Sequence, residues 1–380
     1  MNTHINIRRK GLSVLLALMI GTTALSFSAC DKESADKSTS QDISSDESLP
    51  DTTASSADPE DTSSLQDNDK TDSDSIKVAV AWSNVPDSYS YTSTLKTVEE
   101  TAKSADVELV VLDMVRPDYL EYENNELKKE YKDEHGILSS QAAKLVKTNG
   151  WAGSDADKVM EDVDCIIFPG GWDISPTLYY NEQPWHGIEE DGDFSAERDV
   201  SDYILLKYCI DNNIPTLCIC RGMQMLSVVS GADMIQDIGT WFKEKGIDYD
   251  NEHRDPEKKD LVPHPADIVR DTQLYEILGT ESIDGAPSWH HQLVGSIDDT
   301  ALTVNAYTTT QGEQIIEGVE RADRSFCIGV QFHPEVAVRK NADKEDNAAD
   351  FMDYDKAMSL FYALEEAASE NDSEAIQKAA

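Results

Sequence analysis

The stretch that decides the fold of this chain is Thr216-Leu217-Cys218-Ile219-Cys220-Arg221-Gly222-Met223-Gln224. The residues up to Leu217 predict a short buried strand, and the apolar residues from Met223 to Val229 predict a helix that ends near Gly231. A strand that turns sharply into a helix at a cysteine holds that side chain clear of the backbone. The dipole of the following helix favours a thiolate at its N-terminus. Cys220 is therefore the candidate nucleophile.

Length and charge limit the classes of protein that this chain can belong to. The 380 residues carry a net charge of −42, which argues against nucleic-acid phosphates as partners because like charges repel. Six cysteines are too few and too scattered for a disulfide framework. The first 75 residues differ in composition from the rest, which leaves one large α/β domain with enough chain for a sizeable core.

The N-terminal segment has the pattern of a targeting sequence. Basic Arg8-Arg9-Lys10 precedes the apolar stretch 12–25, which is short for a membrane span, and Ser28-Ala29 stand before Cys30. This resembles a bacterial lipoprotein signal, with residues 1–29 removed and a lipid attached to Cys30. An ordinary secretory signal cut near Ala29 is the alternative. Both predict export, and the first predicts a cell-membrane anchor on the extracytoplasmic face.

Residues 30–75 consist largely of Ser, Thr and Asp, with few apolar side chains. Such a segment cannot bury enough surface to offset its chain entropy, so we expect a disordered tether. The folded domain is expected at 76–370, followed by a short tail at 371–380.

Strand and helix patterns alternate along the folded part. This order predicts an α/β domain with a mainly parallel central sheet covered by helices on both faces. The expected strands are 76–82, 107–112, 165–168, 214–217, 266–269, 302–306, 314–319 and 327–331, and the expected helices are 93–105, 139–147, 199–212, 223–231 and 354–368.

Three predicted strands end in residues suited to chemistry. They are followed by Pro169-Gly170-Gly171, by Cys220-Arg221-Gly222 and by Gln331-Phe332-His333-Pro334-Glu335. Ligands of parallel sheets bind beyond the carboxyl ends of the strands, so these segments are expected to meet. A thiol nucleophile needs a base, and His333 can serve, with Glu335 orienting its ring.

Five stretches, in order, resemble class I glutamine amidotransferase-like hydrolases, above all the γ-glutamyl-γ-aminobutyrate hydrolase group. The resemblance covers residues 76 to about 366. The stretches are Phe168-Pro169-Gly170-Gly171-Trp172-Asp173-Ile174-Ser175-Pro176, Glu197-Arg198-Asp199, Ile219-Cys220-Arg221-Gly222-Met223-Gln224, Ser288-Trp289-His290-His291-Gln292 and Gly329-Val330-Gln331-Phe332-His333-Pro334-Glu335.

The resemblance implies a three-layer, flavodoxin-like sandwich and a catalytic triad of Cys220, His333 and Glu335. It implies a thioester intermediate at Cys220, with the amides of Gly171 and Arg221 as the oxyanion hole. The residues that it implies for substrate binding are Gln224, His291 and Gln292. It implies no cofactor, because covalent thiol chemistry at a γ-amide needs none.

Some residues leave alternatives open or depart from the family. Cys218 stands where the family usually has Gly or Ala, and a second thiol near the nucleophile could oxidise with it. The charged segment 118–153 is expected to form a lid or an added surface. Glu197-Arg198-Asp199 can cap the following helix or contact substrate. We predict no metal site, because Cys218 and Cys220 have no second such pair and zinc needs four ligands. His253 and His264 are isolated in the sequence and are interpreted as structural.

The function predicted from these residues is hydrolysis of γ-glutamyl amide bonds by a membrane-tethered cysteine enzyme. The expected partners are a small γ-glutamyl substrate and the membrane. Two alternatives remain: a surface binding protein without turnover, and a glutaminase subunit that delivers ammonia to a partner. Among the motifs in the chain, none indicates a synthetase or an ammonia acceptor.

Overall fold

The computed structural model describes residues 8–9, 75–186, 192–255, 257 and 261–379. The predicted lipidation site Cys30, and nearly all of the predicted signal and tether, lie outside these residues. Within the described part, no helix combines the length and the apolar character that crossing a membrane requires.

Parallel strands form one half of the central sheet. The pairs β1–β3, β3–β2, β2–β6, β6–β7 and β7–β14 all run parallel, as the alternation of strands and helices predicts. The strands of this half, in spatial order, are β1 (Arg8–Arg9), β3 (Val107–Val111), β2 (Ile76–Val80), β6 (Cys165–Phe168), β7 (Thr216–Ile219) and β14 (Cys327–Val330).

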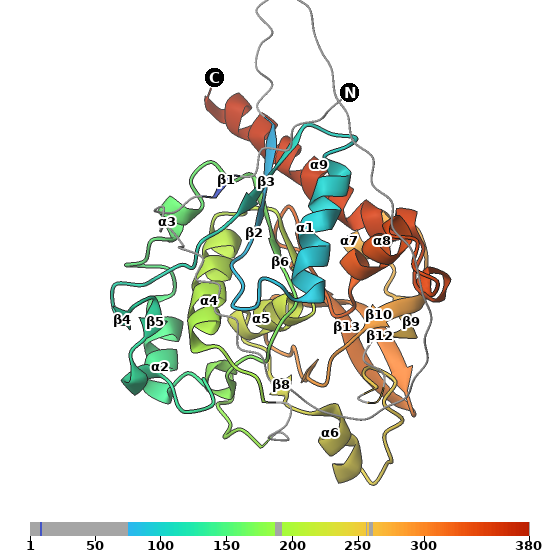
Figure 1. The fold of residues 1–380 in the computed structure, drawn as a ribbon, viewed down its shortest axis with the longest axis horizontal. Coiled ribbons are helices and arrows are strands. Elements are labelled where there is room, and N and C mark those ends of the chain that lie inside the picture. The colour runs from blue at the N-terminus through green and yellow to red at the C-terminus, as the bar shows by residue number, and fades with distance from the viewer. Residues whose placement is uncertain (1–7, 10–74, 187–191, 256, 258–260, 380) are drawn as a thin grey trace, which may run out of the picture. The chain divides into compact units, whose positions relative to one another are not determined.

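Four antiparallel strands continue the sheet beyond β14, drawn in orange in Figure 1. They are, in order, β13 (Glu313–Glu320), β12 (Thr303–Thr310), β9 (Val262–Ile268) and β10 (Ser282–Ser288). The prediction of an α/β fold with a mainly parallel sheet is confirmed, and this antiparallel half extends it. Outside the main sheet lie two small pairs, β4 (Tyr122–Glu123) with β5 (Glu126–Leu127) and β8 (Met234–Ile235) with β11 (Leu293–Val294).

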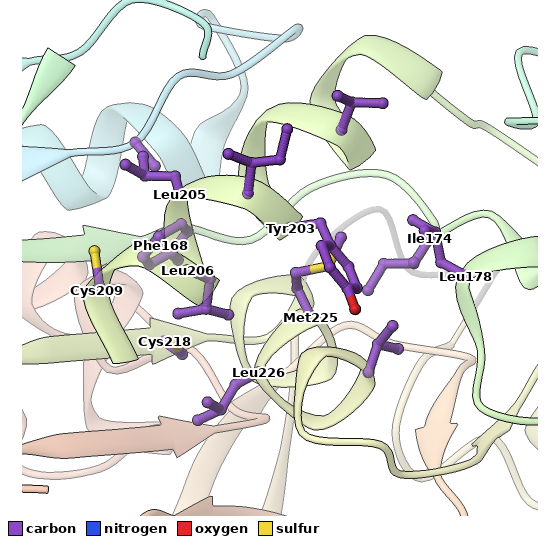
Figure 2. Close-up of a cluster of buried hydrophobic side chains, with 14 of the residues drawn as sticks. Phe168, Ile174, Leu178, Tyr203, Leu205, Leu206, Cys209, Cys218, Met225 and Leu226 are labelled. Carbon is purple, nitrogen blue, oxygen red and sulfur yellow. The ribbon is translucent and has the colours of Figure 1, made fainter. Parts of the chain in front are cut away.

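Two separate apolar clusters cover the two faces of the sheet, because side chains alternate along each strand. Phe168 and Cys218 belong to one cluster, whereas their neighbours Ile167 and Ile219 belong to the other. Figure 2 shows part of the first cluster, where Leu205 and Leu206 meet Phe168 and Met225. The domain is therefore a three-layer sandwich, with helices on both sides of the sheet (Figure 1).

Each face has its own set of helices. The first cluster contains side chains of α2 (Ser140–Asn149), α3 (Ala156–Val159), α4 (Ala196–Asp211) and α5 (Arg221–Val229). The second contains side chains of α1 (Tyr89–Thr101), α7 (Gln273–Leu278), α8 (Pro334–Ala342) and α9 (Tyr354–Ala379). Helix α6 (Ile238–Glu244) packs in a third, small cluster, and short 3-10 turns span Lys129–Tyr131, Pro176–Leu178 and Ala348–Asp350.

Several elements differ from the sequence expectations. Helix α1 begins at Tyr89 rather than Ser93, because the Ser88 side chain caps it by accepting a hydrogen bond from the Tyr91 amide. Strand β9 begins at Val262 although Pro263 and Pro265 lie within it. Strand β12 pairs with β9 only beyond both prolines, at Asp267 and Ile268. The prolines therefore cost no ladder hydrogen bond to that neighbour.

Close packing at the start of α5 requires a glycine. A Cβ atom at Gly222 would lie 2.2 Å from the carbonyl oxygen of Phe168 at the end of β6. Since that neighbour is backbone, it cannot move aside as a flexible side chain would. Gly222 thus allows α5 to approach β6 and fixes the turn that carries Cys220.

We predict that Gly222→Ala lowers the free energy of unfolding by about 1–3 kcal/mol, as overpacking does in other cores. Urea denaturation of the two proteins measures this difference. Gly239 is the matched control, since it is also the second residue of its helix and a Cβ there meets nothing nearer than 3.5 Å. Gly239→Ala should be neutral or stabilising by up to about 1 kcal/mol. Equal losses in the two variants would contradict the packing argument.

Candidate active site

Cys220 lies at the sharp turn between β7 and α5. Its backbone has φ 51° and ψ −106°, an uncommon conformation for a residue with a side chain. The turn is held by its amide, which donates to the carbonyl of Val330 at 2.7 Å. The residue is 5% exposed and lines two cavities. A strained turn at the candidate nucleophile is the arrangement predicted from the sequence.

Cys218 lies on the other face of the sheet from Cys220. It belongs to the apolar cluster that also contains Cys209 and Cys327, whereas Cys220 belongs to the opposite cluster. Burial raises the pKa of the Cys218 thiol well above its ordinary value, which keeps the thiol protonated and unreactive. The five cysteines among the described residues are all free thiols. Cys218, which departs from the family pattern, is therefore a side chain of the core and does not lie beside the candidate nucleophile.

His333 and Glu335 follow β14 at the start of α8. The Nδ1 atom of His333 lies 2.7 Å from Oε1 of Glu335, and both residues are almost fully buried. Burial alone favours the neutral ring, but the Glu335 carboxylate and the Cys220 sulfur outweigh it and raise the pKa of His333 well above its ordinary value. The imidazole is therefore held as a cation between a carboxylate and the candidate nucleophile.

Two glutamine side chains form a chain of hydrogen bonds to the sulfur. Gln331 donates from Nε2 to the Cys220 sulfur at 3.4 Å, and its Oε1 accepts from Nε2 of Gln224 at 3.1 Å. Gln224 also donates to the backbone carbonyl of Gln292 at 3.2 Å. Gln224, which the resemblance implies for substrate binding, thus also orients the side chain of Gln331. Gln331 lies in the motif that contains His333, but no role was predicted for it.

Ser90, which was not among the predicted site residues, contacts both Glu335 and His333. Its hydroxyl donates to Oε1 of Glu335 at 2.7 Å and lies 3.3 Å from Nδ1 of His333. It sits in the first turn of α1, ahead of the predicted start of that helix at Ser93. Only the capping serine at 88 signalled that the helix extends this far. Ser90 is a positioning residue, because its contacts are to the carboxylate and the imidazole.

The two glycines after β6, Gly170 and Gly171, pack so closely against neighbouring side chains that neither position has space for a Cβ atom. A Cβ at Gly171, where φ is 155°, would lie 1.9 Å from Nη1 of Arg198, and one at Gly170 would lie 2.9 Å from Cε1 of His333. Gly171 also lines both cavities together with Cys220. Arg221, the first residue of α5, has an amide in the turn where helix N–H groups lack an intrahelical partner. These are the two amides implied for the oxyanion hole.

Residues of the Glu197-Arg198-Asp199 motif hold the turn after β6 and the start of α5 in place. Arg198 is fully buried and donates from Nη2 to the carbonyls of Pro169 and Gly170, each at 2.9 Å. Burial, together with the neighbouring Arg221, lowers the pKa of Arg198 to about 10, so the guanidinium stays charged. These hydrogen bonds hold the guanidinium of Arg198 against the turn that carries the two glycines. They therefore disfavour the alternative that Arg198 contacts the substrate directly.

His291 lies between two carboxylates at the edge of the site. Its Nε2 is 3.2 Å from Asp173 and its Nδ1 is 3.6 Å from Asp237. Burial opposes a charged ring, but the two carboxylates prevail and raise the pKa of His291 to about 9. His291 and Gln292 both line the smaller cavity, as the resemblance implies for substrate-binding residues.

Cys220 stands where two cavities of different size meet. The larger, of about 1100 Å³, reaches Ser90, His333 and the loop before α1, and the smaller, of about 160 Å³, reaches Gln224 and His291. Of the described residues, those that line the two cavities include none from the segment 118–153. That segment packs instead through β5 and α2 against α4, so it forms an added surface rather than a lid.

The sequence of this chain is similar to those of several known proteins. The chain matches the Peptidase C26 family over residues 119–335. Protein NtpR of Enterococcus hirae is 31% identical over 189 residues, which are 49% of this chain and 73% of NtpR. The γ-glutamyl-γ-aminobutyrate hydrolase of Escherichia coli O157:H7 is 24% identical over 180 residues, 47% of this chain and 66% of that enzyme.

A solved structure, the glutaminase domain of Trypanosoma brucei CTPS with bound acivicin, aligns with a TM-score of 0.41 and 16% identity, covering 78% of this chain and 94% of that one. The segment matched to the family contains the turn at Cys220 and ends at Glu335, so it includes all three residues of the candidate triad. The chain belongs to the Peptidase C26 family of class I glutamine amidotransferase-like enzymes, which act on C–N amide bonds.

Proposed function

We propose that this protein is a cysteine hydrolase that cleaves γ-glutamyl amide bonds through a thioester at Cys220. The observation that carries the proposal is the position of the sulfur between two cavities, with the His333–Glu335 pair beside it. A hydrolase of this kind must hold an acyl group on one side of its nucleophile and a leaving amine on the other.

The proposed reaction has two halves. The Cys220 sulfur attacks the γ-carbonyl, and the amides of Gly171 and Arg221 stabilise the oxyanion that forms. His333 gives its proton to the nitrogen as the C–N bond breaks, which leaves a thioester and a free amine. Water then attacks the thioester carbonyl, His333 takes a proton from it, and glutamate leaves as the thiol is restored.

The smaller cavity has the charges that a γ-glutamyl group requires. The cation Arg254 and the acidic residues Asp173 and Asp193 all line it. An α-carboxylate and an α-ammonium group present the complementary charges, so the glutamyl end can bind in one orientation. The γ-glutamyl-γ-aminobutyrate hydrolase among the relatives acts, by its name, on such a bond.

The larger cavity suits a leaving group well beyond the size of ammonia. Three aromatic side chains, Trp172, Trp289 and Tyr89, line it together with charged residues of both signs. Aromatic walls with a few charged groups are typical of pockets for organic ligands. This width supports a self-contained hydrolase of γ-glutamyl amides over a glutaminase subunit, and the intact triad supports turnover over a binding-only role.

We further propose that the protein is anchored by a lipid on Cys30 to the extracytoplasmic face of the membrane. The proposal rests on the basic, apolar and small residues that precede Cys30. The Ser- and Asp-rich residues after it then act as a tether to the folded domain.

The activity is tested by incubating the purified protein with a panel of γ-glutamyl amides and measuring the amine released. We expect hydrolysis of at least one compound, and a loss of at least about 1000-fold in Cys220→Ser, since the weaker nucleophile cannot form the thioester. Iodoacetamide should alkylate Cys220, and a bound γ-glutamyl amide should slow that alkylation.

Cys218→Ala is the matched control, because Cys218 lies on the same strand but faces the core. It should retain activity and the same pattern of alkylation. Alkylation of Cys220 without release of amine from any γ-glutamyl compound would favour the binding-only alternative.

The pH profile of the reaction reports the role of Glu335. In Glu335→Gln the carboxylate that raises the pKa of His333 is gone, so this pKa falls and the ring loses its proton at lower pH. The basic limb of kcat/KM against pH should therefore move to lower pH by at least about one unit. Glu345→Gln changes another carboxylate in the larger cavity and should leave the limb in place. An unmoved limb in Glu335→Gln would remove Glu335 from the triad.

The anchor is tested by expressing the full chain in a bacterial host that is fed labelled palmitate. The protein should carry the label and sediment with membranes, and Cys30→Ala should lose both properties because it has no thiol to lipidate. Cys209→Ala, a buried cysteine of the folded domain, should keep both. Unlabelled protein in the soluble periplasmic fraction would instead indicate an ordinary secretory signal.

A further inference from the structure

Four buried side chains that the triad does not use converge at one point in the antiparallel half of the sheet. They are His253, His264, His290 and Glu317, and one ligand atom of each lies within 4.8 Å of all the others. Their exposed fractions range from 0% to 5%. Three imidazoles and one carboxylate, all turned inward, form a set that protein interiors rarely assemble without a cation.

The backbone brings these residues together from four separate segments. His264 lies on the buried side of β9, where exposed and buried residues alternate. Glu317 is an inserted residue of β13, because Ala306 pairs with Gly318 and Tyr307 with Ile316. Such bulges re-aim a side chain. His290 follows β10, and its amide donates to the carbonyl of His253 at 3.2 Å, which joins the last two segments.

The outer nitrogen of each ring already has a partner. Nδ1 of His264 lies 2.8 Å from the carbonyl oxygen of Pro265, and Nδ1 of His290 lies 3.0 Å from that of Gln292. Because a carbonyl only accepts, both Nδ1 atoms carry hydrogen, and the inner Nε2 of each neutral ring presents a lone pair. Nε2 of His253 is held at 2.9 Å by the hydroxyl of Thr310. This arrangement is typical of histidines that ligate a metal.

The inner atoms face one another without hydrogen bonds. Nδ1 of His253, Nε2 of His264 and of His290, and both oxygens of Glu317 are buried and have no hydrogen-bond partner among the described residues. The distances from the nitrogens to the nearer Glu317 oxygen are 3.2, 3.7 and 3.6 Å. Ligands of a tetrahedral ion with bonds of about 2.1 Å lie roughly 3.4 Å apart, so the nitrogen-to-carboxylate distances are near that value, and the four atoms, all within 4.8 Å of one another, need to close in only a little to hold one ion.

We propose that His253, His264, His290 and Glu317 bind one structural Zn²⁺ ion. Imidazole nitrogens and a carboxylate are ligands that zinc accepts, and four protein ligands close its tetrahedral shell. Because all four residues are buried, the site offers no open position for a substrate, and its role is to hold the four segments together. The proposal is independent of the hydrolase activity proposed above.

The site adjoins the candidate active site through two contacts. His290 lines the smaller cavity beside Cys220, next in sequence to His291 and Gln292. The carbonyl of Glu317 accepts from the amide of Gln331 at 2.8 Å, and Gln331 donates to the Cys220 sulfur. An ion on these ligands therefore fixes two segments that border the nucleophile.

The test uses the purified full chain, produced with zinc in the medium, and measures its metal content by mass spectrometry. We expect about one zinc ion per chain, and in the cobalt-substituted protein the intense visible bands of a tetrahedral site. A chelator should lower the midpoint of thermal unfolding by roughly 10 °C, and added Zn²⁺ should restore it. These measurements need no variant, so a folding defect cannot obscure them.

Variants then locate the ion. His264→Ala and Glu317→Gln should each lose most of the zinc, and their unfolding midpoints should no longer respond to the chelator. His135→Ala is the matched control, since His135 is a histidine far from the cluster in sequence and packs on Trp185. It should keep both the zinc and the response. A wild-type chain with less than about 0.1 zinc, or zinc retained in both cluster variants, would overturn the proposal.

Discussion

The site depends on a buried ion cluster beneath the two glycines. Arg221 pairs with Asp199 at 2.6 Å and with Asp202, while Arg198 pairs with Asp202 and donates to the carbonyls of Pro169 and Gly170. Such a cluster adds little net stability, because desolvation offsets its attraction, but removing one member costs about 3–5 kcal/mol. The role of the cluster here is to fix the positions of the backbone segments that it joins. It ties the turn after β6 to the helix that starts beside the nucleophile, and so sets the implied oxyanion amides against the sulfur.

Parallel pairing explains why the candidate nucleophile and base could be predicted from sequence. Strands β7 and β14 pair with Ile219 opposite Val330, so the residues that follow them emerge side by side at one rim. Strand ends followed by Gly, Cys and His can be recognised in a sequence. Because neighbouring parallel strands end at the same edge of the sheet, the residues that follow them can be predicted to lie close together. Ser90 was not predictable in this way. It reaches the triad from a helix on one face of the sheet, and a serine in a helical first turn carries no signal of its partner.

The elements missed in the fold share a physical cause. Strand β10 contains Gly285 and Pro287, and the first part of β9 contains two prolines, so neither segment has the composition of a strand, whereas the end of β9 was predicted as the strand 266–269. Tertiary pairing between them overrides that local preference. Helix α8 begins at Pro334, directly after His333, and was not among the predicted helices. Proline suits the first turn of a helix because it lacks the amide hydrogen that would be unpaired there. The apolar runs of the parallel strands, by contrast, were predicted within a few residues.

The histidine cluster was invisible for a different reason, and it changes how the antiparallel half is understood. Its four members stand far apart in the sequence, with none of the short spacings by which zinc sites are recognised. Only the order β13-β12-β9-β10 brings them together. The two halves of the sheet then have different roles. The parallel half presents the thiol and the imidazole, and the antiparallel half holds the loop of His290 to His291 against them. Gln331 is hydrogen-bonded to Glu317 on one side and to Cys220 on the other, so a disturbance of the cluster can reach the sulfur through this residue as well as through His290.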